Sequence, residues 1–448
     1  MSLALAATLA ACATGGCGRS GARRSILLVV VDTLRADALG CYGGERGLTP
    51  RLDAFARDEA VLFENAWAAS SWTLPSFGTI LTGAPPSTHG AGRLDDGFSP
   101  LRERIPTLAR ILADRRYLTM AIVENPFLGR EFALDRGFAR YDHERGTNAV
   151  SRRADEVTRR ALDWAYTVGD RPFFLLVHYF DPHLDYDPPA AFRERFLPDG
   201  EEDAVFPAAD QRALKTGERA PSEAELKRIR RLYDGEVAFV DEQVGLLLDG
   251  MKRTGLDRHL VVVVTSDHGE EFFEHGGFEH GHSLHGEVAR VPLLVRVPGA
   301  PRREARVADL ASHADILPTV LAAIGETAPP PAHVTGRDLL APVSGAPPRD
   351  VLVEGTLYGA EVAGLLSGSL KWSGPPASLF DLAADPREER NLAESDKRAA
   401  ALSRACAEAR AAAEAAGEAF GRRIPADLET ETRRALGIPY LEDPRRGR

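Results

Sequence analysis

An unbroken apolar segment near the start of the chain constrains its fold more than any other feature. Residues 26–31 read Ile-Leu-Leu-Val-Val-Val and stop abruptly at Asp32. Such runs are typical of a central strand that is buried on both faces, as in a parallel sheet. Similar runs occupy residues 117–123, 173–179, 260–266 and 292–297, with helix-like stretches at 150–168 and 223–250. This alternation predicts an α/β fold with a mostly parallel central sheet flanked by helices.

Three of these strands end in polar clusters. Asp32 follows the first, residues 178–183 end or follow the third, and Asp267 with His268 follows the fourth. The carboxyl ends of parallel strands lie at one edge of the sheet, where active sites of this architecture form. We therefore expect these polar residues to converge on one site.

The sequence divides into four parts. We expect residues 1–24 to form a leader and tether, and residues 25–330 to form the large α/β domain that carries these strand ends. Pro-rich segments mark the end of that domain, and short strand patterns in residues 331–395 predict a small C-terminal antiparallel subdomain. Residues 396–448 are rich in Ala and Arg and predict a solvated helical tail.

The leader indicates export. Residues 2–11 are a short apolar run of small residues, and Leu9-Ala10-Ala11-Cys12 resembles a bacterial lipobox. This pattern predicts a protein of the bacterial cell envelope or periplasm, anchored to the membrane by a lipid on Cys12. The alternative is a chance Ala-rich leader, since no basic residue precedes the run.

Composition excludes several classes of protein. There are 55 basic and 66 acidic side chains, a formal net charge of −11, which argues against nucleic-acid binding. No apolar run approaches the roughly 20 residues of a spanning helix. The four cysteines have no zinc-cluster spacing.

Carboxylate and imidazole groups predict a metal site. Asp267 and His268 lie together at a strand end, and Asp32 ends another strand. This combination favours a divalent cation over a structural thiolate zinc. Five histidines fall between positions 268 and 285; for His275 and His285 alone, a solvated loop is the simpler interpretation.

A hydroxyl group precedes a predicted helix start. Pro75 and residues 76–82 have a helical pattern, with Thr73 just before them. An anionic ester could dock in the positive field of this helix N-terminus. The alternative role for Thr73 is that of a helix cap.

Several motifs, in order, resemble the sulfatase family of the alkaline-phosphatase superfamily. They are residues 26–42, 49–53, 63–66 and 72–76, Asp181-Pro182-His183, residues 266–270, 290–293 and 315–319, and residues 379–382 with Asp385-Pro386. The similarity extends over about residues 26–395. It implies a metal-dependent ester hydrolase of that fold, acting on an anionic ester substrate.

The resemblance also implies roles for individual residues. Asp32, Asp267 and His268 match the metal ligands of the family. Thr73 occupies the nucleophile position and His183 matches a catalytic histidine. His282 lies where relatives place a basic group against the leaving oxygen or the anion. The cation could be calcium, manganese, magnesium or zinc.

Two departures bear on the chemistry. Conventional sulfatases have Cys or Ser at the nucleophile position, which is converted to formylglycine, and Arg four residues later; this chain has Thr73 and Phe77. The β-carbon of threonine is secondary and cannot give that aldehyde. Thr33 replaces a second Asp that is common in the family.

These features predict hydrolysis of sulfuric or phosphoric esters by Thr73, with phosphate esters favoured. One alternative is a binuclear zinc phosphodiesterase, in which Asp181, His183 and His282 hold a second ion, or a transferase of phosphorylated groups. The other is a non-catalytic binding protein on a sulfatase scaffold.

Overall fold

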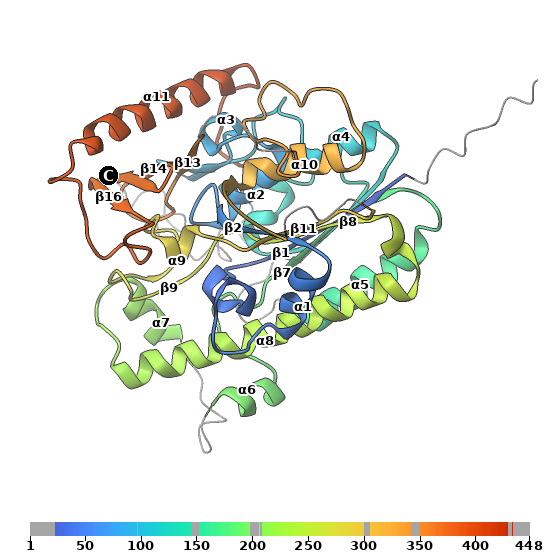
Figure 1. Cartoon of the computed structure of the whole chain (residues 1–448), viewed down its shortest axis with the longest axis horizontal. Helices are drawn as coiled ribbons and strands as arrows, with labels where there is room; N and C mark the ends of the chain where they lie inside the picture. The colour runs from blue at the N-terminus through green and yellow to red at the C-terminus, as the bar shows by residue number, and fades with distance from the viewer. Residues whose placement is uncertain are drawn as a thin grey trace, which may run out of the picture.

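An eight-stranded sheet runs through the molecule, with helices on both faces (Figure 1). The computed structural model describes residues 23–95, 97–144, 152–197, 206, 208–299, 305–341, 349–428 and 432. The strand order is β12 (Arg306–Ser312), β2 (Val61–Trp67), β11 (Leu293–Arg296), β8 (Leu260–Ser266), β1 (Ser25–Val31), β7 (Phe173–Tyr179), β5 (Leu118–Glu124) and β6 (Arg140–Glu144). All neighbouring pairs are parallel except the two that involve β11. The predicted α/β class is confirmed.

The central strand β1 explains why its sequence is apolar throughout. Ile26, Leu28 and Val30 face a core with helices α2 (Thr73–Thr82), α4 (Leu108–Asp114) and α10 (Ile316–Ala323). The alternate residues face a second core with α1 (Pro50–Asp58), α5 (Ala154–Thr167) and α8 (Glu223–Arg253). Residues 26–31 are completely buried, because successive side chains of a strand point to opposite covered faces.

Most predicted elements have the expected positions. β7 and β8 occupy residues 173–179 and 260–266, and α5 and α8 lie within the two helix-like stretches or extend slightly beyond them. The run at 292–297 forms β11, which is antiparallel to both of its neighbours.

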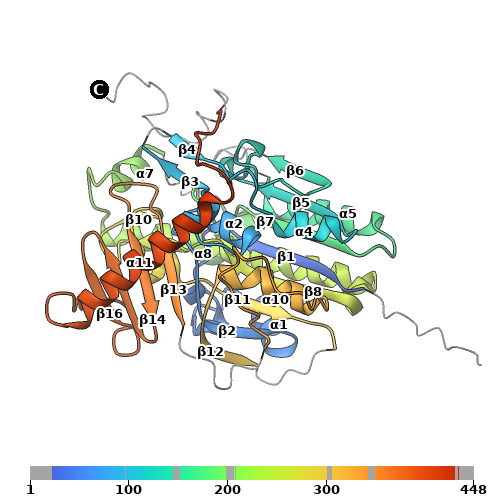
Figure 2. The same cartoon turned by 90° about the horizontal axis from the view of Figure 1, so that it is seen from above.

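The C-terminal part contains a separate four-stranded antiparallel sheet (Figure 2). Its strands, in order, are β13 (Asp350–Glu354), β14 (Ala363–Ser367), β15 (Leu370–Gly374) and β16 (Ser378–Asp381). Helix α11 (Arg398–Glu418) lies against this sheet, where Cys406 packs on Ala363 and Leu365. The helix predicted to be solvated therefore buries one side. The small antiparallel subdomain is confirmed.

Short elements complete the described chain: α3 (Pro86–His89), α6 (Ala190–Phe196), α7 (Ala208–Lys215), α9 (Gly286–Ala289), and the hairpins of β3 (Gly92–Leu94) with β4 (Gly97–Ser99) and of β9 (Glu271–Phe272) with β10 (Phe278–Glu279). Within the described residues, no helix combines the length and the apolarity needed to cross a bilayer. Cys12 and the rest of the leader up to residue 22 lie outside the described residues.

Candidate active site

Four neighbouring strands carry polar residues at one edge of the main sheet. Asp267 and His268 follow β8, Asp32 follows β1, His178 lies near the end of β7, and Asn125 follows β5. The first four of these side chains are completely buried, and Asn125 is 3% exposed. The structure thus brings together Asp32, Asp267 and His268, which are far apart in sequence.

The orientation of His268 makes these three residues a candidate cation site. Its Nδ1 lies 3.0 Å from the carbonyl oxygen of Gly269, which can only accept, so Nδ1 carries the proton. The lone pair of Nε2 then faces Asp267 Oδ2 at 3.3 Å and Asp32 Oδ1 at 3.6 Å. These two buried carboxylate oxygens have no hydrogen-bond partner among the described residues. Two carboxylate oxygens and an imidazole nitrogen suit a divalent cation.

His178 belongs to the same cluster, although the sequence did not single it out as a ligand. Its Nδ1 accepts a hydrogen bond from the Glu124 backbone N–H, and its Nε2 lies 3.3 Å from Asp32 Oδ2. His178 Nε2 is therefore close to the Asp32 carboxylate, although it makes no well-aligned hydrogen bond to it. Phe77 packs edge-on against His178, with the ring centroids 5.2 Å apart. Asp32, His178 and Asp267 also form a group whose ligand atoms lie within 4.8 Å of one another.

The two buried carboxylates have opposite pKa shifts. Burial acts to raise the pKa of Asp32, but the contact with His178 and the charges of nearby histidines outweigh it, so this pKa is lowered. Burial and the charge of Asp32 raise the pKa of Asp267 well above its usual range. Two carboxylates in one buried site repel each other when both are ionised. A cation between them removes that repulsion.

Thr73 lies beside this cluster as the first residue of α2. Its Oγ1 is 3.3 Å from Nε2 of His268 and accepts a 3.2 Å hydrogen bond from Nδ2 of Asn125. The same Asn125 amide donates to Asp32 Oδ2 at 3.0 Å. Trp72, not Thr73, is the N-cap residue of α2, and no side chain caps the helix. The contacts of the Thr73 hydroxyl are thus those of the polar cluster rather than those of a helix cap.

The sequence contains only weak indications of Asn125 and His178. Asn125 directly follows a strand, as Asp32 does. In the structure it is one of the few described non-glycine residues with a positive φ (94°). Its side-chain oxygen accepts from the Phe127 N–H and fixes this turn. His178 is the one charged-type residue in an apolar strand, and a satisfied core histidine is the usual interpretation of that pattern.

A row of imidazole rings leads away from His268. The ring of His280 lies 4.3 Å from that of His268, and the ring of His183 lies 5.1 Å from His280. His183 is partly exposed, and its Nδ1 donates to the Leu184 carbonyl. Nδ1 of His280 is 2.8 Å from Glu270, whose pKa burial and Glu279 raise to about 8. The sequence predicted His183 but not His280 as a site residue.

His282 lies in a different environment. Its Nε2 is 2.8 Å from Glu271 Oε2, and burial is outweighed by this carboxylate, so the pKa of His282 is raised. Among the described residues, Asp181, His183 and His282 do not form a group close enough to hold one ion. These three residues therefore give no support to the second ion of a binuclear zinc phosphodiesterase.

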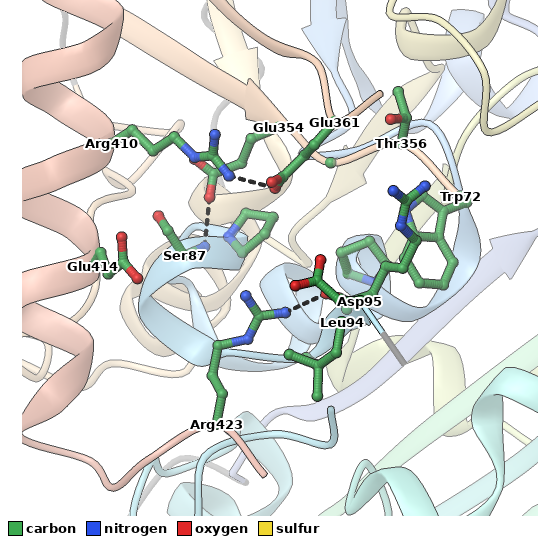
Figure 3. A pocket seen from close by; sticks show the side chains of 16 residues that line it. Trp72, Ser87, Leu94, Asp95, Glu354, Thr356, Glu361, Arg410, Glu414 and Arg423 are labelled. Carbon is green, nitrogen blue, oxygen red and sulfur yellow. Dashed lines mark hydrogen bonds and ion pairs between the residues drawn. The ribbon is translucent and has the colours of Figure 1, made fainter. Parts of the chain in front are cut away.

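A polar cavity of about 440 Å³ lies beside the segment that carries Thr73 (Figure 3). Its walls include Trp72, Glu354, Arg410 and Arg423, which come from the catalytic part, the small sheet and the C-terminal helix region. Trp72 Nε1 and Glu354 Oε2 are buried and have no hydrogen-bond partner among the described residues. The cavity lies next to the buried polar cluster, but the residues of the cluster do not line it.

Comparisons with known proteins agree with the observed fold. Residues 24–326 match the Sulfatase family. The chain is 25% identical to an uncharacterized sulfatase, YidJ, of Escherichia coli over 381 residues, which cover 76% of this chain and 74% of the relative. A phosphonate monoester hydrolase of Agrobacterium radiobacter superposes with a TM-score of 0.68 at 22% identity, covering 88% of this chain and 96% of that one. A protein solved with its substrate D-glucosamine-2-N,6-O-disulfate superposes with a TM-score of 0.71 at 20% identity. The superposition covers 91% of this chain and 100% of that one.

The fold is that of solved sulfatases, and its buried polar cluster lies at the strand ends, where active sites of α/β proteins form. The chain belongs to the sulfatase family, since the matched segment spans more than half of its length. Members of this family depend on metal, and the described residues contain candidate metal-binding groups.

Proposed function

We propose that this protein is a metal-dependent hydrolase of sulfate or phosphate esters, with Thr73 as its nucleophile and phosphate esters as its better substrates. The observation that carries this proposal is the position of Thr73 Oγ1, 3.3 Å from His268 Nε2 and beside two buried carboxylates. Family membership supports ester hydrolysis in general.

Asp32, Asp267 and His268 are the residues that hold the cation in this proposal. Their unpartnered oxygens and the free lone pair of Nε2 fit a divalent ion. When bound, the ion supplies positive charge that favours an ionised hydroxyl and offsets negative charge on the ester. Asn125 fixes the orientation of Asp32 by donating a hydrogen bond to it, and His178 lies 3.3 Å from the same oxygen.

The chain's own residues account for the two halves of the reaction. The Thr73 hydroxyl gives its proton to solvent water; Oγ1 then attacks phosphorus or sulfur in line, and the bond to the alcohol oxygen breaks. The hydrogen bond from Asn125 favours the ionised form of Oγ1. His183, which is partly exposed, protonates the departing oxygen, and water then releases Thr73. His282 is a less favourable donor, because its ring nitrogen is engaged by Glu271.

The preference for phosphate follows from the nucleophile. Thr73 cannot form the aldehyde of conventional sulfatases, and Phe77 occupies the place of the arginine that accompanies that modification. Phe77 is 1% exposed and packs against His178, so it has become part of the core. A threonyl phosphate can be cleaved by water at phosphorus, whereas a threonyl sulfate lacks the elimination route that the aldehyde provides. A phosphonate monoester hydrolase is among the proteins of similar fold.

The non-reacting part of the ester has a place to bind in the cavity beside Trp72. Trp72 and Pro75 line this cavity and flank Thr73 in sequence. The unpartnered groups of Trp72 and Glu354 are free to bind the polar atoms of a substrate. From the leader sequence we propose that the protein is exported to the cell envelope and anchored by a lipid on Cys12.

The decisive experiment compares matched 4-nitrophenyl phosphate and 4-nitrophenyl sulfate with the metal-loaded full chain. We expect faster turnover of the phosphate ester and loss of both activities in Thr73→Ala. Thr79→Ala, further along the same helix and bonded to His89, is the matched control and should retain activity. A clear preference for sulfate contradicts the argument from threonine, and full activity of Thr73→Ala contradicts the nucleophile.

A further inference from the structure

We propose that Glu271, His275 and Glu287 form a second divalent-cation site, of the kind that Zn²⁺ occupies, separate from the catalytic cluster. One ligand atom from each residue lies within 4.8 Å of the others. Glu271 and His275 belong to the β9 strand and the turn after it, and Glu287 lies on α9. A nitrogen and two carboxylate oxygens are a donor set that zinc accepts, with a free position for water.

The surroundings of His275 direct one ring nitrogen at the two carboxylates. Its Nε2 lies 3.2 Å from the carbonyl oxygen of Glu388, which can only accept, so this nitrogen carries a proton. Nδ1 faces Glu287 Oε1 at 2.5 Å. A histidine that donates one N–H to a backbone carbonyl and presents its other nitrogen to a cation is the usual arrangement around zinc.

The carboxylate of Glu271 is already fixed in position. It accepts the backbone N–H groups of His275 and Gly277 and lies 2.8 Å from Nε2 of His282. Its side chain is 1% exposed, whereas His275 is 18% exposed, so the cluster is enclosed but reachable from solvent.

The charges of the cluster match a doubly charged ion. Lys371 offsets Glu388, with its Nζ 2.6 and 2.8 Å from the two carboxylate oxygens. Glu271 and Glu287 contribute one carboxylate each to the site. The rings of His275 and His285 stack at 3.7 Å with an interplanar angle of 5°, an arrangement that disfavours a positive charge on both. An ion at Nδ1 replaces the proton that His275 otherwise needs there.

The proposed site lies beside a contact between two parts of the fold. His275 contacts Glu388, which follows the small antiparallel sheet, while Glu271 and Glu287 belong to the segment between β8 and β11. An ion there joins the turn after β9 to α9 and holds the His275 ring in the position from which it contacts Glu388. Its role is structural, so variants of it should lose heat stability before they lose the chemical step.

The test counts ions on the intact chain. Metal-stripped protein is loaded with excess ZnCl₂, passed through gel filtration and analysed for zinc. We expect two equivalents of zinc in the wild type. Each of the single variants Asp267→Asn, His275→Ala and Glu287→Gln should bind one equivalent, and the double variant Asp267→Asn/His275→Ala should bind none. Zinc should raise the melting temperature of Asp267→Asn but not that of this double variant.

Glu274→Gln is the matched control. This glutamate lies between two of the ligands in sequence, but its carboxylate binds Arg35 and Arg230. It should retain both ions. Two equivalents in His275→Ala and Glu287→Gln, or none in a folded Asp267→Asn protein, overturn the second site. If Asp267→Asn binds as much zinc as the wild type while Glu287→Gln binds one equivalent less, the second site stands and the assignment of the catalytic cation site is contradicted.

Discussion

The hydroxyl oxygen of Thr73 lies 3.3 Å from Nε2 of His268, although 195 residues separate the two in sequence. The contact joins the first turn of α2 to the end of β8. The same Nε2 faces the two carboxylates of the candidate cation site. A hydroxyl at this position is close to the charge of any cation that the site binds.

Removing this hydroxyl tests its role. Thr73→Ala should lower kcat by about 10³-fold or more while substrate binding changes little, because the covalent step loses its attacking atom. Thr73→Ser keeps the hydroxyl and should retain part of the activity. Initial rates on 4-nitrophenyl phosphate measure both effects. A Thr73→Ser protein as inactive as Thr73→Ala indicates a packing role for the methyl group.

Removing a carboxylate tests the cation site. Asp267→Ala should abolish catalytic turnover and lose one equivalent of bound metal at the same time, because no other described carboxylate takes its place beside Asp32 and His268. Metal analysis and kinetics on the same preparation check this. Asp309→Asn, an exposed residue of β12, is the control and should behave as wild type. Turnover with unchanged metal in Asp267→Ala contradicts the assignment.

Asn125 should act by positioning. Asn125→Ala removes the hydrogen bonds to Thr73 and Asp32, and the loss of one buried partner costs about 1–3 kcal/mol, or about 5–150-fold in kcat. KM should change less than kcat, because Asn125 contacts Thr73, the proposed nucleophile. Steady-state kinetics distinguish the two constants. An effect on KM alone points to substrate binding instead.

The sequence was sufficient for the sheet because burial on both faces requires continuous apolar strands. It could not predict that β11 runs antiparallel, since a short apolar run has the same pattern in either direction. Strand-end polarity likewise predicted the convergence of Asp32 with Asp267 and His268.

The remaining site residues depend on tertiary structure. Asn125 reaches Thr73 because β5 lies next to β7, an adjacency that no local pattern encodes. His280 and His282 are two residues apart and would share one face of a regular strand. Gly281 has φ 80° between them, so His280 meets His268 whereas His282 meets Glu271. Spacing alone could not distinguish these two histidines.

The leader gives a prediction about location. Cys12→Ser should release the protein from membranes or leave an uncleaved precursor, because the thiol is the acceptor for the lipid. Fractionation of cells that express either form, with a mass measurement of the mature N-terminus, decides the matter. Unchanged fractionation of an unlipidated protein contradicts the anchor. Cys17→Ser, five residues later, is the control and should remain at the membrane.

The buried pair of Glu388 and Lys371 should make stability depend on pH. Burial acts to raise the pKa of Glu388, but Lys371 and His285 outweigh it and lower the pKa to about 2. A lowered carboxyl pKa stabilises the fold above the unfolded value of about 4.5, and this contribution is lost as the pH falls toward 2. The shift corresponds to about 3 kcal/mol. Glu388→Gln should therefore lower the free energy of unfolding by about this amount at pH 7, and the difference from wild type should shrink below pH 4.5. Urea unfolding at several pH values measures it, with the exposed Glu389→Gln as control. A difference that is the same at pH 7 and pH 3 contradicts the role of the ionised carboxylate.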